Sequence, residues 1–148
     1  MKQLFLILLF IMLCRLLLAP EARTFFIEKA KAIDPYKWIT EAISWVESRH
    51  NDTIVNWHEL AYGRYQIRKV RIDDYFNRTG IRYALNDMLD SAKAEKVFIF
   101  YARLSGWRNP EQIARKWNGG EERGMRYRQT KQYWQRVKKR LNNLQVSQ

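Results

Sequence analysis

The stretch that decides the fold is DPYKWITEAISWVESRHN, residues 34–51. Asp34 and Pro35 form a typical helix start, in which an N-cap residue is followed by proline at the first helical position. Apolar residues then recur at helical spacing along one face: Ile39, Ala42, Ile43 and Val46. The sequence therefore predicts an amphipathic helix that ends between residues 49 and 51.

The rest of the chain beyond Arg23 is also predicted to be helical nearly throughout. It has few helix breakers, since the whole sequence contains 3 prolines and 6 glycines, and no stretch keeps a clean apolar/polar alternation. The exception is residues 52–67, which we expect to be loop or short irregular structure. Further helices are predicted at residues 70–77, 86–104 and 110–117, followed by a last helix that carries Tyr133, Trp134, Val137, Leu141 and Leu144. The expected architecture is one all-α domain.

Composition and charge narrow the class of protein. A chain of 148 residues is long enough for one domain with a real core, and 47% apolar with 28% charged residues is typical of a globular protein. The 27 basic residues outnumber the 15 acidic ones, which gives a net charge of +12. This charge favours polyanionic partners, namely nucleic acid, an anionic membrane or an anionic cell-wall polymer.

The first 22 residues resemble a secretory signal or a short N-terminal membrane anchor. Lys2 precedes an almost unbroken apolar run, residues 4–18, and the small residues Ala19 and Ala22 follow it. Arg15 interrupts this run before it reaches the roughly 20 apolar residues that span a bilayer. We therefore expect an exported protein of the periplasm or cell envelope.

The single cysteine, Cys14, lies inside this N-terminal segment. A chain with only one cysteine can form no internal disulfide and no zinc site built from several cysteines. The preceding residue, Leu13, is larger than a lipoprotein signal requires, so we expect no lipidation. The folded domain is expected to span residues 23–148.

Glu47 is the strongest candidate for a catalytic residue. It follows Ile43 by four positions and Ile39 by eight, so it continues the apolar face of its own helix. A carboxyl group on such a face is desolvated and has a raised pKa, which suits a general acid near neutral pH. The alternative is a structural glutamate that pairs with an arginine or caps a neighbouring helix.

Four short motifs occur in a fixed order along the chain. The first is Glu47-Ser48 with Asn51, and the second runs from Ala61 to Ile67 as AYGRYQI. The third is ARKWNGG, residues 114–120, and the fourth is TKQYW, residues 130–134. This order and spacing resemble the motifs of the lytic transglycosylases with a lysozyme-like fold, which are Glu-Ser-Gly-x-Asn, Gly-Leu-Met-Gln-Ile, Ala-x-x-Tyr-Asn-Ala-Gly and Glu-Thr-Arg-x-Tyr.

The resemblance implies a lysozyme-like domain with a substrate cleft that cleaves peptidoglycan between N-acetylmuramic acid and N-acetylglucosamine. Glu47 would be the single acid/base, and the sugar's own 6-hydroxyl would close a 1,6-anhydro ring. Ser48 and Gln66 would line the cleft around the glutamate. Asn118 would match the asparagine of the third motif, and Tyr133 the tyrosine that reaches toward the catalytic carboxyl.

The sequence departs from the family pattern near the expected site. Arg49 replaces glycine, Tyr65 replaces methionine, and Trp117 replaces tyrosine, with Gly119 where alanine is usual. These changes bear on substrate fit more than on the fold. A groove lined by four aromatic side chains would bind the sugar faces: Tyr62, Tyr65, Trp117 and Tyr133.

A hydrolase with two carboxylates is the nearest alternative. Glycosidases of that kind need a second Asp or Glu about 5–9.5 Å from the first. The candidates are Asp52, Glu59, Asp73 and Asp74. If one of them faces Glu47, hydrolysis by water becomes the better interpretation.

No metal or organic cofactor is expected. His50 and His58 lack a third nearby ligand in a standard spacing, and nucleotide-binding motifs are absent from the sequence. The expected partners are glycan strands and anionic envelope polymers, with the protein acting as a monomer. A catalytically idle wall-binding module remains open, as does nucleic-acid binding through the basic segment 126–140, although the N-terminal signal argues against nucleic acid.

Overall fold

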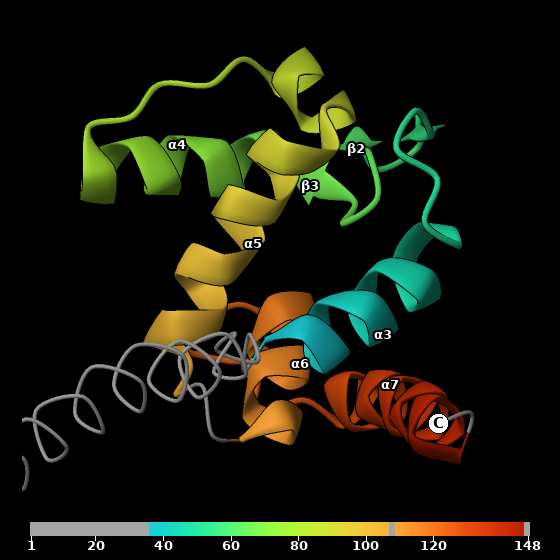
Figure 1. Ribbon diagram of the computed structural model, residues 1–148. Helices are drawn as coiled ribbons and strands as arrows, with labels where there is room; N and C mark the ends of the chain where they lie inside the picture. Colours follow the sequence, from blue (N-terminus) through green and yellow to red (C-terminus); the bar gives the residue numbers. More distant parts are fainter. Residues whose placement is uncertain (1–35, 107–108, 147–148) are drawn as a thin grey trace, which may run out of the picture. The chain divides into compact units, whose positions relative to one another are not determined.

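A computed structural model describes residues 36–106 and 109–146, and all of them belong to one unit, residues 35–148 (Figure 1). The predicted N-terminal segment, Cys14 and the helix start at residues 34–35 lie outside the described residues. The described elements are α3 (Lys37–Ser48), β1 (Val55–Asn56), β2 (Ala61–Tyr62), β3 (Ile67–Arg68), α4 (Lys69–Thr79), the 3-10 helix η1 (Leu85–Leu89), α5 (Ser91–Leu104), α6 (Pro110–Gly119) and α7 (Arg128–Val146).

The described chain is mostly helical, as the sequence predicts, but it is not purely α. The region expected to be irregular contains three strands in an antiparallel sheet of order β1-β2-β3. Val55 pairs with Tyr62, and Tyr62 in turn pairs with Ile67. Because each strand has only two residues, the alternation that marks a strand has no length in which to appear.

The helix predicted over residues 86–104 is divided in the structure. Asp90 ends η1 and caps α5, since its Oδ1 accepts hydrogen bonds from the backbone N–H groups of Ala92 (2.9 Å) and Lys93 (3.1 Å). From the helical spacing we expect Leu89, Ala92, Val97, Tyr101 and Leu104 to share one face of this helix, but only Val97 and Tyr101 of these five are buried. Ala92 and Leu104 are exposed, and the buried residues of α5 are Ala94, Val97, Phe98, Tyr101 and Ala102.

The other helix boundaries lie close to the predicted ones. Asn109 caps α6 by accepting from the Gln112 N–H at 3.0 Å, and Pro110 occupies the first turn. Gly80, in the left-handed conformation, ends α4, and Gly120, with a positive φ of 84°, ends α6. Figure 1 shows α5 running from the η1 end of the unit toward α6, with α3 above α7.

The core lies where α3, α5, α6 and α7 meet. Helix α7 packs against both α3 and α6, and α3 also contacts α5 and α6. The most deeply buried apolar side chains here are Ala42, Ile43, Val97, Phe98, Ile113, Ala114 and Val137. This packing fixes the last turn of α3 against α7, and that is where Glu47 lies.

Candidate active site

Glu47 lies in the last turn of α3. The helix ends directly after it, because Arg49 and His50 both take left-handed backbone conformations, with φ of 58° and 63°. The residue as a whole is partly exposed, while its carboxyl group is almost fully enclosed by protein. The Glu47 side chain therefore points into the protein rather than into solvent.

The partner of Glu47 comes from the far end of the chain. Tyr133, on α7, donates its hydroxyl hydrogen to Glu47 Oε1 at 2.7 Å. This is the contact that the resemblance predicts for Tyr133. The tyrosine is 2% exposed, so the bond is shielded from water. A shielded bond to a carboxylate is stronger than the same bond in water.

Burial raises the pKa of Glu47 from 4.5 to about 7. The Tyr133 hydrogen bond and the positive charge of Arg136 lower that pKa, but less than burial raises it. The negative charge of Glu59 raises it further, and Arg68 lowers it slightly. The group is therefore placed to carry a proton near neutral pH and to release it there.

Tyr133 stays protonated under the same conditions. Burial, together with the adjacent Glu47 carboxylate, raises the pKa of its hydroxyl well above 10.0. The tyrosine therefore acts as a fixed hydrogen-bond donor and does not compete with Glu47 for the role of acid.

The side chains of Ser48 and Gln66 donate hydrogen bonds to backbone carbonyl groups and so fix the local backbone. Ser48 is 7% exposed, and its hydroxyl donates to the carbonyl oxygens of Ser44 (3.2 Å) and Arg64 (3.0 Å). Gln66 has φ of 50°, and its Nε2 donates to the Gly63 carbonyl at 3.0 Å. Gln66 is still partly exposed, whereas the buried Ser48 does not line an open cleft as expected.

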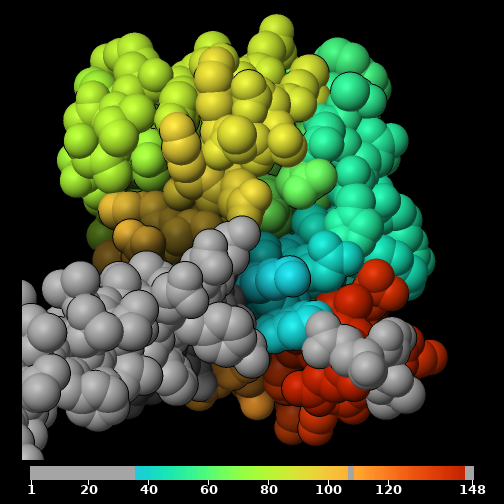
Figure 2. Space-filling model, in the orientation of Figure 1, coloured from blue at the N-terminus to red at the C-terminus, as the bar shows by residue number. Residues whose placement is uncertain are grey.

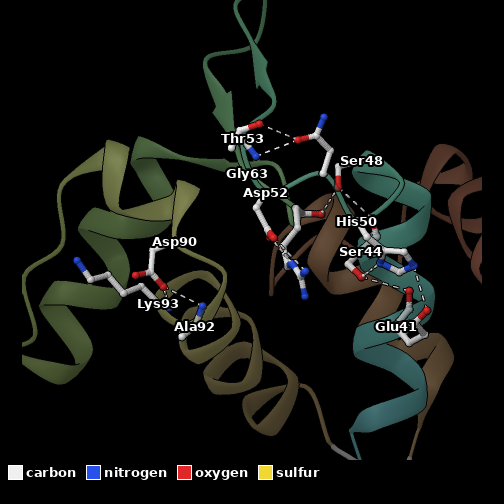
Figure 3. A network of polar contacts seen from close by, with 12 residues as sticks. Glu41, Ser44, Ser48, His50, Asp52, Thr53, Gly63, Asp90, Ala92 and Lys93 are labelled. Atoms are coloured by element: carbon white, nitrogen blue, oxygen red, sulfur yellow. Dashed lines mark hydrogen bonds and ion pairs between the residues drawn. The ribbon is translucent and has the colours of Figure 1, made fainter.

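The polar network that surrounds these residues fixes the sheet to α3 (Figure 3). Arg64 bonds to Asp52 through two nitrogens, one of them Nη2 at 3.2 Å. His50 Nδ1 lies 2.7 Å from Ser44 Oγ, and its Nε2 lies 3.0 Å from Glu41 Oε1. These contacts hold the turn after Glu47 and keep the short strands against the end of the helix.

All four aromatic side chains of the expected groove are buried, since Tyr62 is 9% exposed and also belongs to the core. Tyr65, Trp117 and Tyr133 are 1%, 7% and 2% exposed, so their ring faces are not available to a sugar. Tyr65 stacks on Phe98 with ring centres 4.8 Å apart, and Phe98 lies 4.9 Å from Trp117. These rings are part of the core.

A half-buried arginine, Arg71, lies over the Trp117 ring. The Arg71 guanidinium lies 4.2 Å from the Trp117 ring centre, and its Nη2 donates to the Trp117 carbonyl at 2.8 Å. Asn118, the next residue, is exposed at the end of α6. Arg71 thus joins α4 to α6, while Asn118 faces solvent.

Trp57 is the most exposed aromatic side chain of this region, and the motifs of the sequence did not point to it. It is 73% exposed and makes an edge contact with Tyr62, with ring centres 6.3 Å apart. The segment that carries it, residues 49–60, lies on the surface beside α3 (Figure 2). A tryptophan in a largely polar segment between two helices is unusual, and this feature of the sequence could have identified Trp57.

The four candidate second carboxylates differ in their partners. All four form ion pairs with local cations: Asp52 with Arg64, Glu59 with Arg68, Asp73 with Lys69, and Asp74 with Arg78. Glu59 is exposed and lies 3.9 Å from Arg68 Nη1. Among these four carboxylates, Glu59 is the one whose charge affects the pKa of Glu47.

Within residues 36–106 and 109–146, the structure contains no cluster of three or more His, Cys, Asp or Glu side chains suited to a metal ion. His58 is exposed, and His50 is engaged with Ser44 and Glu41. In the same ranges, no helix has the length and apolar character needed to cross a membrane.

Comparisons with protein-family models, curated proteins and solved structures found no match to this chain.

Proposed function

We propose that the protein is a peptidoglycan lytic transglycosylase with a lysozyme-like domain, and that Glu47 is its acid/base. The observation that carries the proposal is the enclosed Glu47 carboxyl, whose pKa is about 7 and whose Oε1 accepts a hydrogen bond from Tyr133. A general acid works best when its pKa lies near the working pH, and an ordinary glutamate would already be ionised there.

In the proposed reaction, protonated Glu47 gives its proton to the glycosidic oxygen between N-acetylmuramic acid and N-acetylglucosamine. The β-1,4 bond breaks, and N-acetylglucosamine leaves with a hydroxyl group. The Glu47 carboxylate then takes the proton of the muramic acid 6-hydroxyl, whose oxygen bonds to C1 and closes the 1,6-anhydro ring. The glutamate ends protonated, and neither water nor a cofactor is consumed.

The surroundings of Glu47 suit both halves of this cycle. Burial favours the protonated form, which the first step needs. The Tyr133 hydroxyl and the Arg136 charge favour the carboxylate, which the second step needs. Because these influences oppose each other, the pKa of Glu47 lies near 7, where the group can both donate and accept a proton.

Substrate binding is proposed to use exposed groups near the end of α3. Trp57 and the partly exposed Gln66 are accessible on that side, and Asn118 is exposed at the end of α6. An exposed indole ring can stack on a sugar face. The net charge of +12 would keep the protein near anionic envelope polymers. We propose that the protein acts outside the cytoplasm as a monomer, exported or anchored through its first 22 residues.

The test is mass spectrometry of the fragments released from purified peptidoglycan by the wild-type protein and by Glu47→Gln. Fragments ending in 1,6-anhydro sugar with the wild type, and none with the variant, are the expected result. Glu122→Gln is a matched control, because Glu122 is an exposed glutamate on the loop before α7. Equal cleavage by Glu47→Gln would refute the assignment of Glu47.

A muramidase that uses water is the second candidate, and Glu59 is the observation that favours it. Its charge acts on the Glu47 carboxyl, and it is exposed toward solvent. In that case the fragments would carry reducing ends, and Glu59→Gln would abolish their release. Anhydro ends that persist in Glu59→Gln would exclude this candidate. No cleavage by the wild type would favour a wall-binding module without activity.

A further inference from the structure

A cationic pocket lies beside the end of α3. Its volume is about 270 Å³, and it lies between the last turn of α3 and the second half of α7. The residues that line it are Trp45, Val46, Arg49, Arg136, Lys139, Arg140 and Asn143. Four of these seven side chains are cationic, and the list contains no carboxylate.

The cations converge on one aromatic ring. The Arg49 guanidinium lies 3.4 Å from the centre of the Trp45 ring, and that of Arg140 lies 4.8 Å from the same centre. Because both guanidinium groups lie against the same ring, two positive charges are brought close together, and like charges repel unless an anion neutralises them. The ring offsets part of this repulsion through its negative face.

The positive charge of the pocket is only partly neutralised by the protein. Among the described residues, Glu41 is the one carboxylate that pairs with any of the four cations, through Arg140 Nη2 at 3.5 Å. Glu41 is shared with His50. The Nε atom of Arg140 is buried and has no hydrogen-bond partner. A buried donor without a partner is rare, because its desolvation is not compensated.

The backbone of Arg49 adds an independent observation. Its φ of 58° lies in the left-handed region, where glycine is unstrained and a long side chain is not. The position is therefore occupied by arginine at a conformational cost. Strain of this kind is concentrated at functional sites, where the side chain itself is needed. Here the side chain contributes one of the pocket's guanidinium groups.

We propose that this pocket binds a single phosphate group. An excess of several positive charges over one shared carboxylate suits an oxyanion that carries two negative charges better than it suits a carboxylate. Guanidinium groups match the geometry of phosphate oxygens through paired N–H donors, and the free Arg140 Nε–H is one such donor. The phosphate could be a free ion or part of a lipid headgroup. This proposal does not depend on the function proposed for Glu47.

The first experiment is isothermal titration calorimetry of the full chain with inorganic phosphate. Two variants remove one cation each from the pocket, Arg140→Gln and Arg49→Gly. Arg49→Gly introduces no backbone strain, since glycine adopts the left-handed conformation readily. The matched control is Lys138→Gln, which removes the same charge from an exposed position of α7 outside the pocket. Each pocket variant should weaken binding about tenfold or more, as loss of a charged hydrogen bond does, and the control by less than about twofold.

A second arm identifies the source of the phosphate. It measures sedimentation with vesicles that contain phosphatidic acid, against vesicles of equal surface charge made with oleic acid. Binding of inorganic phosphate alone supports a free phosphate, and selective binding to phosphatidic acid supports a headgroup, provided that the pocket variants lose it. Equal weakening by Lys138→Gln and Arg140→Gln would overturn the proposal, since it would indicate diffuse surface charge. The absence of binding in both arms would also overturn it.

Discussion

Replacing Glu47 by glutamine should stabilise the protein at neutral and alkaline pH while abolishing cleavage. The folded state holds the Glu47 carboxyl at a pKa of about 7, against 4.5 for an ordinary glutamate. A raised pKa in the folded state gives stability that is complete below pH 4.5 and is lost as the pH rises through 7. Above that range the buried carboxylate is a cost that glutamine does not carry.

The size of this effect follows from the two pKa values. The difference between 4.5 and about 7 corresponds to about 3 kcal/mol, at about 1.4 kcal/mol for each pKa unit. The glutamine oxygen can still accept the hydrogen bond from Tyr133, so little other energy is lost. For a domain of this size, about 3 kcal/mol raises Tm by roughly 10 °C.

The assay is thermal unfolding followed by circular dichroism between pH 4 and pH 8. The Tm of Glu47→Gln should exceed that of the wild type by roughly 10 °C at pH 8, and the two should agree within about 2 °C at pH 4. Glu122→Gln should show no such pH dependence, because Glu122 is exposed. A Tm difference that is constant across this range, or a less stable Glu47→Gln at pH 8, would refute the reasoning.

Three other substitutions test separate parts of the structure. Tyr133→Phe removes the hydrogen bond that lowers the pKa of Glu47, so the alkaline limb of the pH–activity profile should move up by about one pH unit; an unmoved limb would contradict this. Gly63→Ala should cost more than about 3 kcal/mol in urea unfolding, because φ is 68° and a Cβ would lie 1.9 Å from the Met88 carbonyl oxygen; a loss below about 1 kcal/mol would argue against that close approach. Trp57→Ala should weaken sedimentation with insoluble peptidoglycan and leave Tm within about 2 °C, since Trp57 is 73% exposed. Unchanged sedimentation would exclude it from the binding surface.

The sequence was sufficient to predict the helix that carries Glu47 and the contact of Glu47 with Tyr133. The first prediction rests on helical periodicity, which is reliable over a helix of 12 residues. The second came from motif order alone, because no local pattern relates residues on α3 and α7. The proximity of Arg136 could be inferred once Tyr133 was placed, since it lies one helical turn later on α7.

The orientation of the aromatic residues could not be predicted. Tyr65 lies in a four-residue turn between two strands of two residues each, so neither helical nor strand periodicity assigns it a face. Trp117 is on a helix, but its burial depends on Arg71, which reaches it from α4. An aromatic residue near a motif is therefore as compatible with the core as with a groove, and only packing decides between them.

The bond between Glu47 and Tyr133 joins α3 to α7 through two residues that are 86 positions apart in the chain. A ribosome synthesises α3 long before α7, and until α7 docks the glutamate is hydrated, with the acidity of any surface carboxylate. The unit therefore acquires its proton donor in the last stage of folding. Under the function proposed here, a chain that has not yet docked α7 lacks both the Tyr133 contact and the burial that raises the pKa of Glu47, so docking of α7 completes the acid/base.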